Sequence, residues 1–136
     1  MMRPRMPRGW SAPLLWAGLL LAGLLAGGCG VGSRSALAAV PGGDAERGAE
    51  ALRSYGCGAC HTIPGIAGAN ALVGPPLTDW SKRHYIAGTL PNTPENMLRW
   101  LQSPQAIRPG TAMPTLGVTE EDARDISAYL YSLGRN

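Results

Sequence analysis

The chain has 136 residues, of which 45% are hydrophobic and 15% charged, with 19 glycines and 12 prolines. Its net charge of +3 arises near the N-terminus, because beyond residue 40 only eight of the 12 Lys and Arg remain against all 9 Asp and Glu. The length allows one domain, and a near-neutral domain excludes nucleic-acid binding, which needs clustered Lys and Arg.

The first 28 residues predict a signal peptide or membrane anchor. Three arginines precede an uncharged stretch, residues 9–33, that is rich in Leu, Ala and Gly, which is the charge order and composition of an export signal. Small residues stand directly before Cys29 and resemble the lipobox at which bacterial lipoproteins are cut and acylated on the cysteine. We therefore expect a lipoprotein on the extracytoplasmic (periplasmic) side, anchored in the membrane through lipidated Cys29.

Two other forms of the N-terminus stay open. The sequence Ala36-Leu37-Ala38 has the small-x-small pattern of ordinary signal peptidase, so cleavage would follow Ala38. Without cleavage, the apolar stretch is long enough to cross a bilayer, which takes about 20 apolar residues. Residues 29–43 are small, with Gly and Pro and no apolar periodicity, and predict a flexible linker before a domain at residues 44–136.

Three segments of the domain have the pattern of helices. In residues 44–56, apolar and small side chains recur on one face between an Asp N-cap and a final Gly. Residues 93–103 begin with Thr and Pro and end before Pro104. Residues 119–134 have a Thr N-cap, an acidic first turn, an apolar face and a final Gly. Because no alternating run is long enough for a strand, we predict an all-α fold of three principal helices joined by long loops. Loops of this length without secondary structure are uncommon unless another group organises them.

The motif CGACH at residues 57–61 carries the chemistry of the chain. Two thiols at this spacing reach the two vinyl groups of a haem, and the next residue offers an imidazole to the iron. The motif predicts one haem c, bonded covalently through Cys57 and Cys60 and ligated by His61. A thioredoxin-like pair shares Cys-x-x-Cys but belongs beside a βαβ pattern, and zinc would need His84 as fourth ligand without a second paired motif.

The sixth iron ligand is predicted to be Met113. Beyond the apolar N-terminal stretch the only other methionine is Met97, which falls on a predicted helix and is expected to fill the core. Met113 stands in PGTAMP, residues 109–114, a stiff loop in which no helical face calls for an apolar side chain. A thioether held there can ligate iron, and His/Met ligation raises the reduction potential.

Residues 48–133 as a whole resemble the class I cytochromes c. They are most similar to the cytochrome c domain fused to subunit II of some bacterial haem-copper oxidases, above all along GTLPNTPENMLRWLQSPQAIRPGTAMP. The copper-binding domain and paired transmembrane helices of that subunit are not in this sequence, so we expect the domain to stand alone. The resemblance implies the class I cytochrome c fold, with loops wrapped around one haem. It also implies a close crossing of first and last helices, where Gly48 lets the aromatic Tyr129 pack.

The resemblance implies roles for four further residues in binding the cofactor. The Pro75 carbonyl, in a Gly-Pro turn, would accept the second ring N–H of His61. Arg83 would lie near a haem propionate, and Thr111 would hydrogen-bond a propionate or the backbone beside the methionine. Trp100 would pack against the haem. Each of these also has a plain structural reading as a turn, surface or core residue.

The sequence departs from mitochondrial relatives, which carry a ring of lysines for acidic partners. Lys82 is the only lysine in the chain, and Gln105 and Ala112 stand in the equivalent loop. Strong electrostatic steering onto an acidic oxidase is therefore not expected. An anchored carrier needs it less, because the anchor raises local concentration.

We expect a carrier of single electrons in a respiratory or photosynthetic chain, with no small-molecule substrate. Change between Fe(II) and Fe(III) makes or breaks no bond in a substrate, so the chain has no catalytic residue and is not an enzyme. The donor would be a quinol-oxidising complex or a dehydrogenase in the membrane, and the acceptor a terminal oxidase. Two alternatives stay open: a dedicated electron-transfer subunit of a larger oxidase or dehydrogenase complex, and a haem enzyme or sensor whose sixth site opens to a small ligand.

Overall fold

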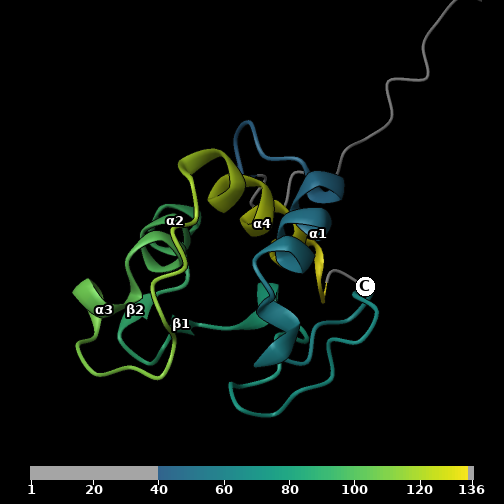
Figure 1. Cartoon of the computed structure of the whole chain (residues 1–136). Helices are drawn as coiled ribbons and strands as arrows, with labels where there is room; N and C mark the ends of the chain where they lie inside the picture. The colour runs from purple at the N-terminus through teal and green to yellow at the C-terminus, as the bar shows by residue number, and fades with distance from the viewer. Residues whose placement is uncertain (1–39, 135–136) are drawn as a thin grey trace, which may run out of the picture. The chain divides into compact units, whose positions relative to one another are not determined.

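The computed structural model describes residues 40–134. Its elements are, in chain order, α1 (Ala45–Ser54), β1 (Tyr85–Ile86), β2 (Leu90–Pro91), α2 (Pro94–Gln102), α3 (Pro104–Ile107) and α4 (Glu120–Ser132) (Figure 1). Single 3-10 turns lie at Cys57–Ala59 and Trp80–Lys82. The expected signal or anchor, most of the linker and the lipid site Cys29 lie outside the described residues. Within residues 40–134, no helix has the length and apolar character that a membrane crossing requires.

The three longer helices begin at the capping residues that the sequence indicates. The side chains of Asp44, Thr93 and Thr119 each accept hydrogen bonds from backbone N–H groups two or three residues further on. These bonds satisfy donors that have no partner within a helix. The α1 helix ends just before Gly56, which has a φ of 69°, and Pro104 ends α2 and begins α3. Local sequence signals therefore set the starts of all three helices and the ends of α1 and α2.

The first and last helices touch at Gly48. α1 packs along α4, and α2 also packs against α4, as Figure 1 shows. A Cβ atom at Gly48 would overlap with the carbonyl of Asp125 and lie 3.0 Å from the backbone N of Ile126, so the close approach requires glycine. Tyr129, the expected aromatic partner, is partly buried against the core. The Tyr129 hydroxyl donates to Pro64 O at 2.5 Å and thereby ties α4 to the loop after His61.

A buried carboxylate joins the same two helices. Asp125 is 2% exposed and accepts hydrogen bonds from the Asp44 backbone N at 2.7 Å and from Arg47 Nε and Nη2 at 2.7 and 3.0 Å. The hydrogen bond from Arg47 holds the pKa of the Asp125 carboxyl below its usual range. A charge at this depth is tolerated because it is paired and hydrogen-bonded.

The core lies between the helices and extends under the loops. Its largest fully buried aliphatic side chains are Leu52, Ile63, Ile86, Ile126 and Leu130. Two of these, Ile63 and Ile86, come from loop and hairpin rather than from helix. Val40, which falls in the expected linker, is 7% exposed and belongs to the core. Apolar packing therefore begins N-terminal to residue 44.

The sequence does not indicate the small hairpin of β1 and β2. Tyr85 pairs with Pro91 and Ile86 with Leu90 in an antiparallel register. Strands of two residues contain no alternating run, so periodicity has nothing to detect. The all-α prediction is confirmed for the main elements, to which the structure adds this hairpin and the short α3.

Candidate haem-binding site

The two cysteines and His61 lie in one tight turn directly after α1. The backbone N–H groups of Cys60 and His61 both donate to Cys57 O, at 3.2 and 3.1 Å. Both cysteines are free thiols and partly buried. Burial raises the pKa of the Cys57 thiol, which opposes formation of the thiolate that a thiol–disulfide exchange pair uses. The turn therefore presents two thiols and an imidazole together.

The imidazole of His61 is fixed from one side. Its Nδ1 lies 2.7 Å from Pro75 O, and because a carbonyl only accepts, Nδ1 carries the proton and Nε2 keeps a free lone pair. Gly74 packs on the ring face, where a Cβ would overlap with His61 Cε1. The Gly74 backbone N donates to Cys60 O at 2.7 Å, which closes the loop onto the turn. This is the orientation that a ligating histidine needs.

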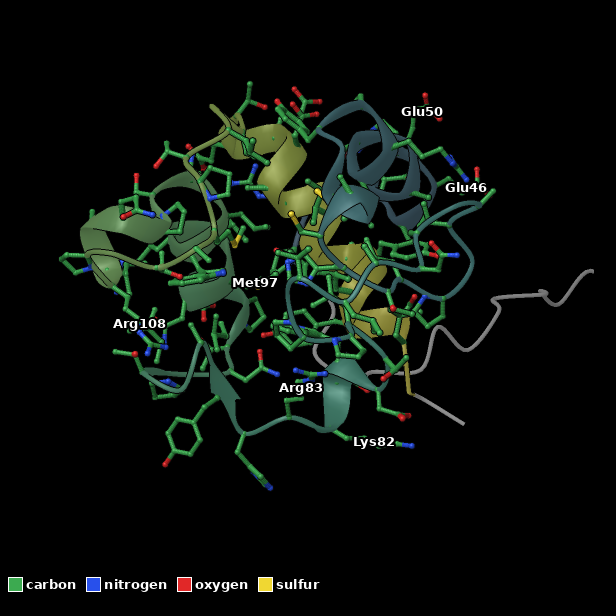
Figure 2. The ribbon with its side chains drawn as sticks, turned by 60° about the horizontal axis from the view of Figure 1, so that its bottom comes forward. Glu46, Glu50, Lys82, Arg83, Met97 and Arg108 are labelled. Carbon is green, nitrogen blue, oxygen red and sulfur yellow. The ribbon has the colours of Figure 1, made fainter. Side chains whose placement is uncertain are left out.

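Three other side chains of the predicted site share one apolar cluster. Trp100 of α2 is 7% exposed and lies in the core, and Cys57 and Met113 are partly buried against that core. A thiol and a thioether thus border the same apolar interior. Met97, labelled in Figure 2, is 2% exposed within α2, which agrees with its expected place in the core.

Arg83 is held against the loop that follows Pro75. Its guanidinium lies 5.3 Å from the centre of the Trp80 ring and donates to Pro76 O and, at 3.5 Å, to Thr78 O. Figure 2 shows Arg83 turned toward the body of the domain, whereas the neighbouring Lys82 extends outward. The structure therefore places Arg83 at carbonyls of the segment that directly follows Pro75, whose own carbonyl contacts His61.

Asn92 holds the segment that carries Arg83, and no sequence pattern marks it. Its Nδ2 donates to the carbonyls of Trp80 and Arg83 at 3.1 and 3.0 Å, while its Oδ1 accepts from the Tyr131 hydroxyl at 2.7 Å. Burial raises the pKa of Tyr131 to about 12, so the hydroxyl remains a donor at neutral pH. One asparagine side chain thus links α4 to this segment through three hydrogen bonds.

The groups present fit a covalently attached haem better than zinc. Two free thiols, an oriented imidazole and a thioether on an apolar wall are the donors that haem c requires. His84, the fourth ligand that zinc would need, is exposed, and within residues 40–134 no three His, Cys, Asp or Glu side chains are grouped as a metal site. The βαβ unit of a thioredoxin-like fold is likewise not formed by the described residues.

Comparisons with known proteins agree with this chemistry. The family described as cytochrome c matches residues 45–134, from the first residue of α1 onward. Cytochrome c oxidase subunit 2 of Alkalihalophilus pseudofirmus is 36% identical over 90 residues, which cover 65% of this chain and 25% of that protein. Cytochrome c oxidase subunit 2 of Bacillus sp. strain PS3 is 35% identical over 88 residues, which cover 62% of this chain and 25% of that protein. The match therefore spans a quarter of the length of each relative.

Proposed function

Because this chain belongs to the cytochrome c family, we propose that it carries single electrons through one haem c. Cys57 and Cys60 would attach the haem, and His61 and Met113 would ligate its iron. The haem would supply a reversible one-electron couple. The observation that carries the proposal is the 2.7 Å contact between His61 Nδ1 and Pro75 O, because it leaves Nε2 oriented and free.

The remaining site residues would hold the cofactor in place. Pro75 would keep the imidazole in one orientation. Arg83 would turn N–H donors toward a propionate, since a guanidinium has five and two backbone carbonyls do not use them all. Thr111 would hydrogen-bond beside the methionine, and Trp100 would form an apolar wall of the cavity.

The visible spectrum of the matured protein tests this proposal. We expect a covalent pigment that stays with the polypeptide in acidified acetone, and a red-region band of the oxidised protein that reports methionine ligation. The variant Met113→Ala should lose that band and, when reduced, bind carbon monoxide. Met97→Leu is the matched control, because it removes a buried methionine of α2 and replaces it with a side chain of similar volume. It should leave the spectrum unchanged.

Three results would overturn parts of the proposal. A colourless product, or a pigment that acidified acetone extracts, would contradict covalent haem. An unchanged spectrum in Met113→Ala would remove Met113 as ligand. Carbon monoxide binding to the reduced wild-type protein would favour the sensor or haem enzyme over the carrier.

We also propose that electrons reach a terminal oxidase through an apolar surface beside the haem-attachment turn. From residue 54 to residue 78 the chain has no Lys, Arg, Asp or Glu, and Leu72 and Val73 are 79% and 75% exposed. Both precede Gly74, whose backbone is bonded to Cys60. Apolar side chains exposed beside a functional site are typical of protein contact surfaces. The relatives support an oxidase as acceptor, since both are cytochrome c oxidase subunits, and a quinol-oxidising complex or a dehydrogenase would be the donor.

A dedicated subunit of a larger oxidoreductase is the second candidate, favoured by the same relatives. Purification from membranes in mild detergent separates the two. A free carrier should be recovered by itself, whereas a dedicated subunit should be recovered in constant ratio with its partner chains.

We propose an extracytoplasmic, membrane-anchored location through lipidated Cys29. The support is the uncharged stretch and the small residues before that cysteine. Mass spectrometry of the mature N-terminus tests it, because a diacylated Cys29, a free Ala39 and an intact arginine-bearing start have different masses. A free Ala39 or an intact arginine-bearing start would contradict the proposed lipid anchor.

A further inference from the structure

We propose that Gln105 positions the ligand loop of Met113, an inference that rests on the proposed role of Met113. Gln105 is the second residue of α3, and its side-chain amide bonds three backbone groups of the loop that follows. Its Nε2 donates to Thr111 O at 2.7 Å and to Met113 O at 2.8 Å. Its Oε1 accepts from the backbone N of Gly110 at 3.1 Å.

The three partners fix the orientation of this amide. Two carbonyls can only accept, and one backbone N–H can only donate. Only an amide with its nitrogen toward Thr111 and Met113 and its oxygen toward Gly110 satisfies all three. No other side chain of the same length combines two donors and an acceptor in this way, so the position is specific for glutamine.

The loop depends on this side chain because its own backbone bonds stop short of the methionine. Residues 108–111 form a turn in which the Thr111 backbone N donates to Arg108 O at 3.1 Å. Pro109 and then Gly110, with a φ of 79°, occupy its central positions, as in a type II turn. Beyond it, among the residues that the structure describes, residues 112–118 make no hydrogen bond to other backbone groups. The bond from Gln105 to Met113 O thus extends past the turn to the residue that carries the thioether.

The other end of the connection is anchored in the core. Pro104, directly before Gln105, is less than 2% exposed. The turn of α3 is closed by bonds from the backbone N of Ala106 to Ser103 O at 3.2 Å and from that of Arg108 to Pro104 O at 2.9 Å. Gln105 therefore connects a fixed point of the core to the segment 112–118, which has no backbone hydrogen bond of its own within the described part of the chain. Its loss should allow Met113 to leave the iron more often.

Imidazole binding to the oxidised holoprotein measures this opening, because an external ligand enters only when the methionine leaves. In Gln105→Glu the carboxylate can still accept from Gly110, but it has no donor for the two carbonyls. We expect the binding rate to rise about tenfold, the order of change that loss of one or two net hydrogen bonds produces. Gln105→Ala should show the same rise, because it removes both donors and the acceptor.

The control is Gln102→Glu, which makes the same change of charge three residues earlier, on α2. It should bind imidazole at the wild-type rate. The free energy of unfolding of each variant, measured in urea by far-UV circular dichroism, separates positioning from general weakening. A rise in rate with unfolding free energy unchanged supports the inference. A rate within twofold of wild type in both Gln105 variants, or a rise no larger than the fall in global stability accounts for, overturns it. Failure of the proposed function is a separate result, seen as an unchanged spectrum in Met113→Ala.

Discussion

The crossing of α1 and α4 and the loops that carry the proposed haem ligands are held together by different means. At the crossing, Gly48 brings two backbones into contact, and the carboxylate of Asp125 is bonded by Arg47 of α1 and by the N-cap residue Asp44. In the loops, single polar side chains such as Gln105 and Asn92 each bond several backbone groups. The difference teaches that stability and ligand geometry have separate sources here. Variants at the crossing should change the free energy of unfolding, and variants in the loops should change the ligand geometry.

The largest expected effect is that of Gly48→Val. Because the added side chain meets helix backbone that cannot move aside, we expect a loss of about 3 kcal/mol in the free energy of unfolding. Urea titration followed by far-UV circular dichroism and by haem absorbance measures it. The two probes should give one transition, since the loops have no core of their own.

Glu50→Ala is the control for this change, on the exposed face of the same helix. It should alter stability by less than about 0.5 kcal/mol. Equal losses in the two variants would mean that the crossing is not where stability resides.

The next effect is pH-dependent and belongs to Asp125. Asp125→Asn removes the charge that Arg47 pairs, and should cost about 2 kcal/mol at pH 7. Because the folded pKa of Asp125 is depressed, its stabilisation is complete above the unfolded value of about 3.9 and is lost as pH falls through the folded value. The difference in free energy of unfolding between wild type and Asp125→Asn should therefore narrow below about pH 4. Thermal unfolding at a series of pH values measures this difference.

Asp79→Asn provides the comparison for Asp125→Asn. Asp79 has a 62% exposed side chain paired with Lys82, and its φ of 50° is one that asparagine also adopts. Its effect should stay below about 0.5 kcal/mol at every pH. If the difference in stability between wild type and Asp125→Asn stayed constant down to acid pH, the carboxylate of Asp125 would act by its shape and not by its charge.

The smallest effect is expected where α4 of the helix crossing contacts the loop after His61. Tyr129→Phe removes the hydrogen bond from α4 to Pro64 O and should cost about 1 kcal/mol. Tyr85→Phe is a matched control, because Tyr85 is 62% exposed. Urea midpoints of the two variants provide the measurement. If Tyr129→Phe also changed the red-region band, the two regions would be coupled more closely than we infer.

The parts of the molecule that the sequence predicts are those encoded locally. The capping residues Asp44, Thr93 and Thr119 mark the helix starts, and a five-residue motif presents the thiols and imidazole. The unpredicted parts depend on contacts between distant residues. The backbone N of Asp44 reaches a carboxylate 81 residues away, and Asn92 joins segments that have no periodicity in common. Gln105 acts over a short distance, but three hydrogen bonds from one amide leave no pattern that spacing can reveal.

One consequence of the contact between Gly74 and His61 concerns speed rather than stability. A ring packed on one face by a glycine backbone and bonded at Nδ1 by a carbonyl between two prolines has little freedom to rotate. In the proposed haem complex, the imidazole should keep one orientation in both oxidation states of the iron, so that few nuclei must rearrange during each electron transfer. Dipoles that are already in place require no reorganisation at the moment of reaction, which is the condition for rapid exchange with a partner of nearly equal potential.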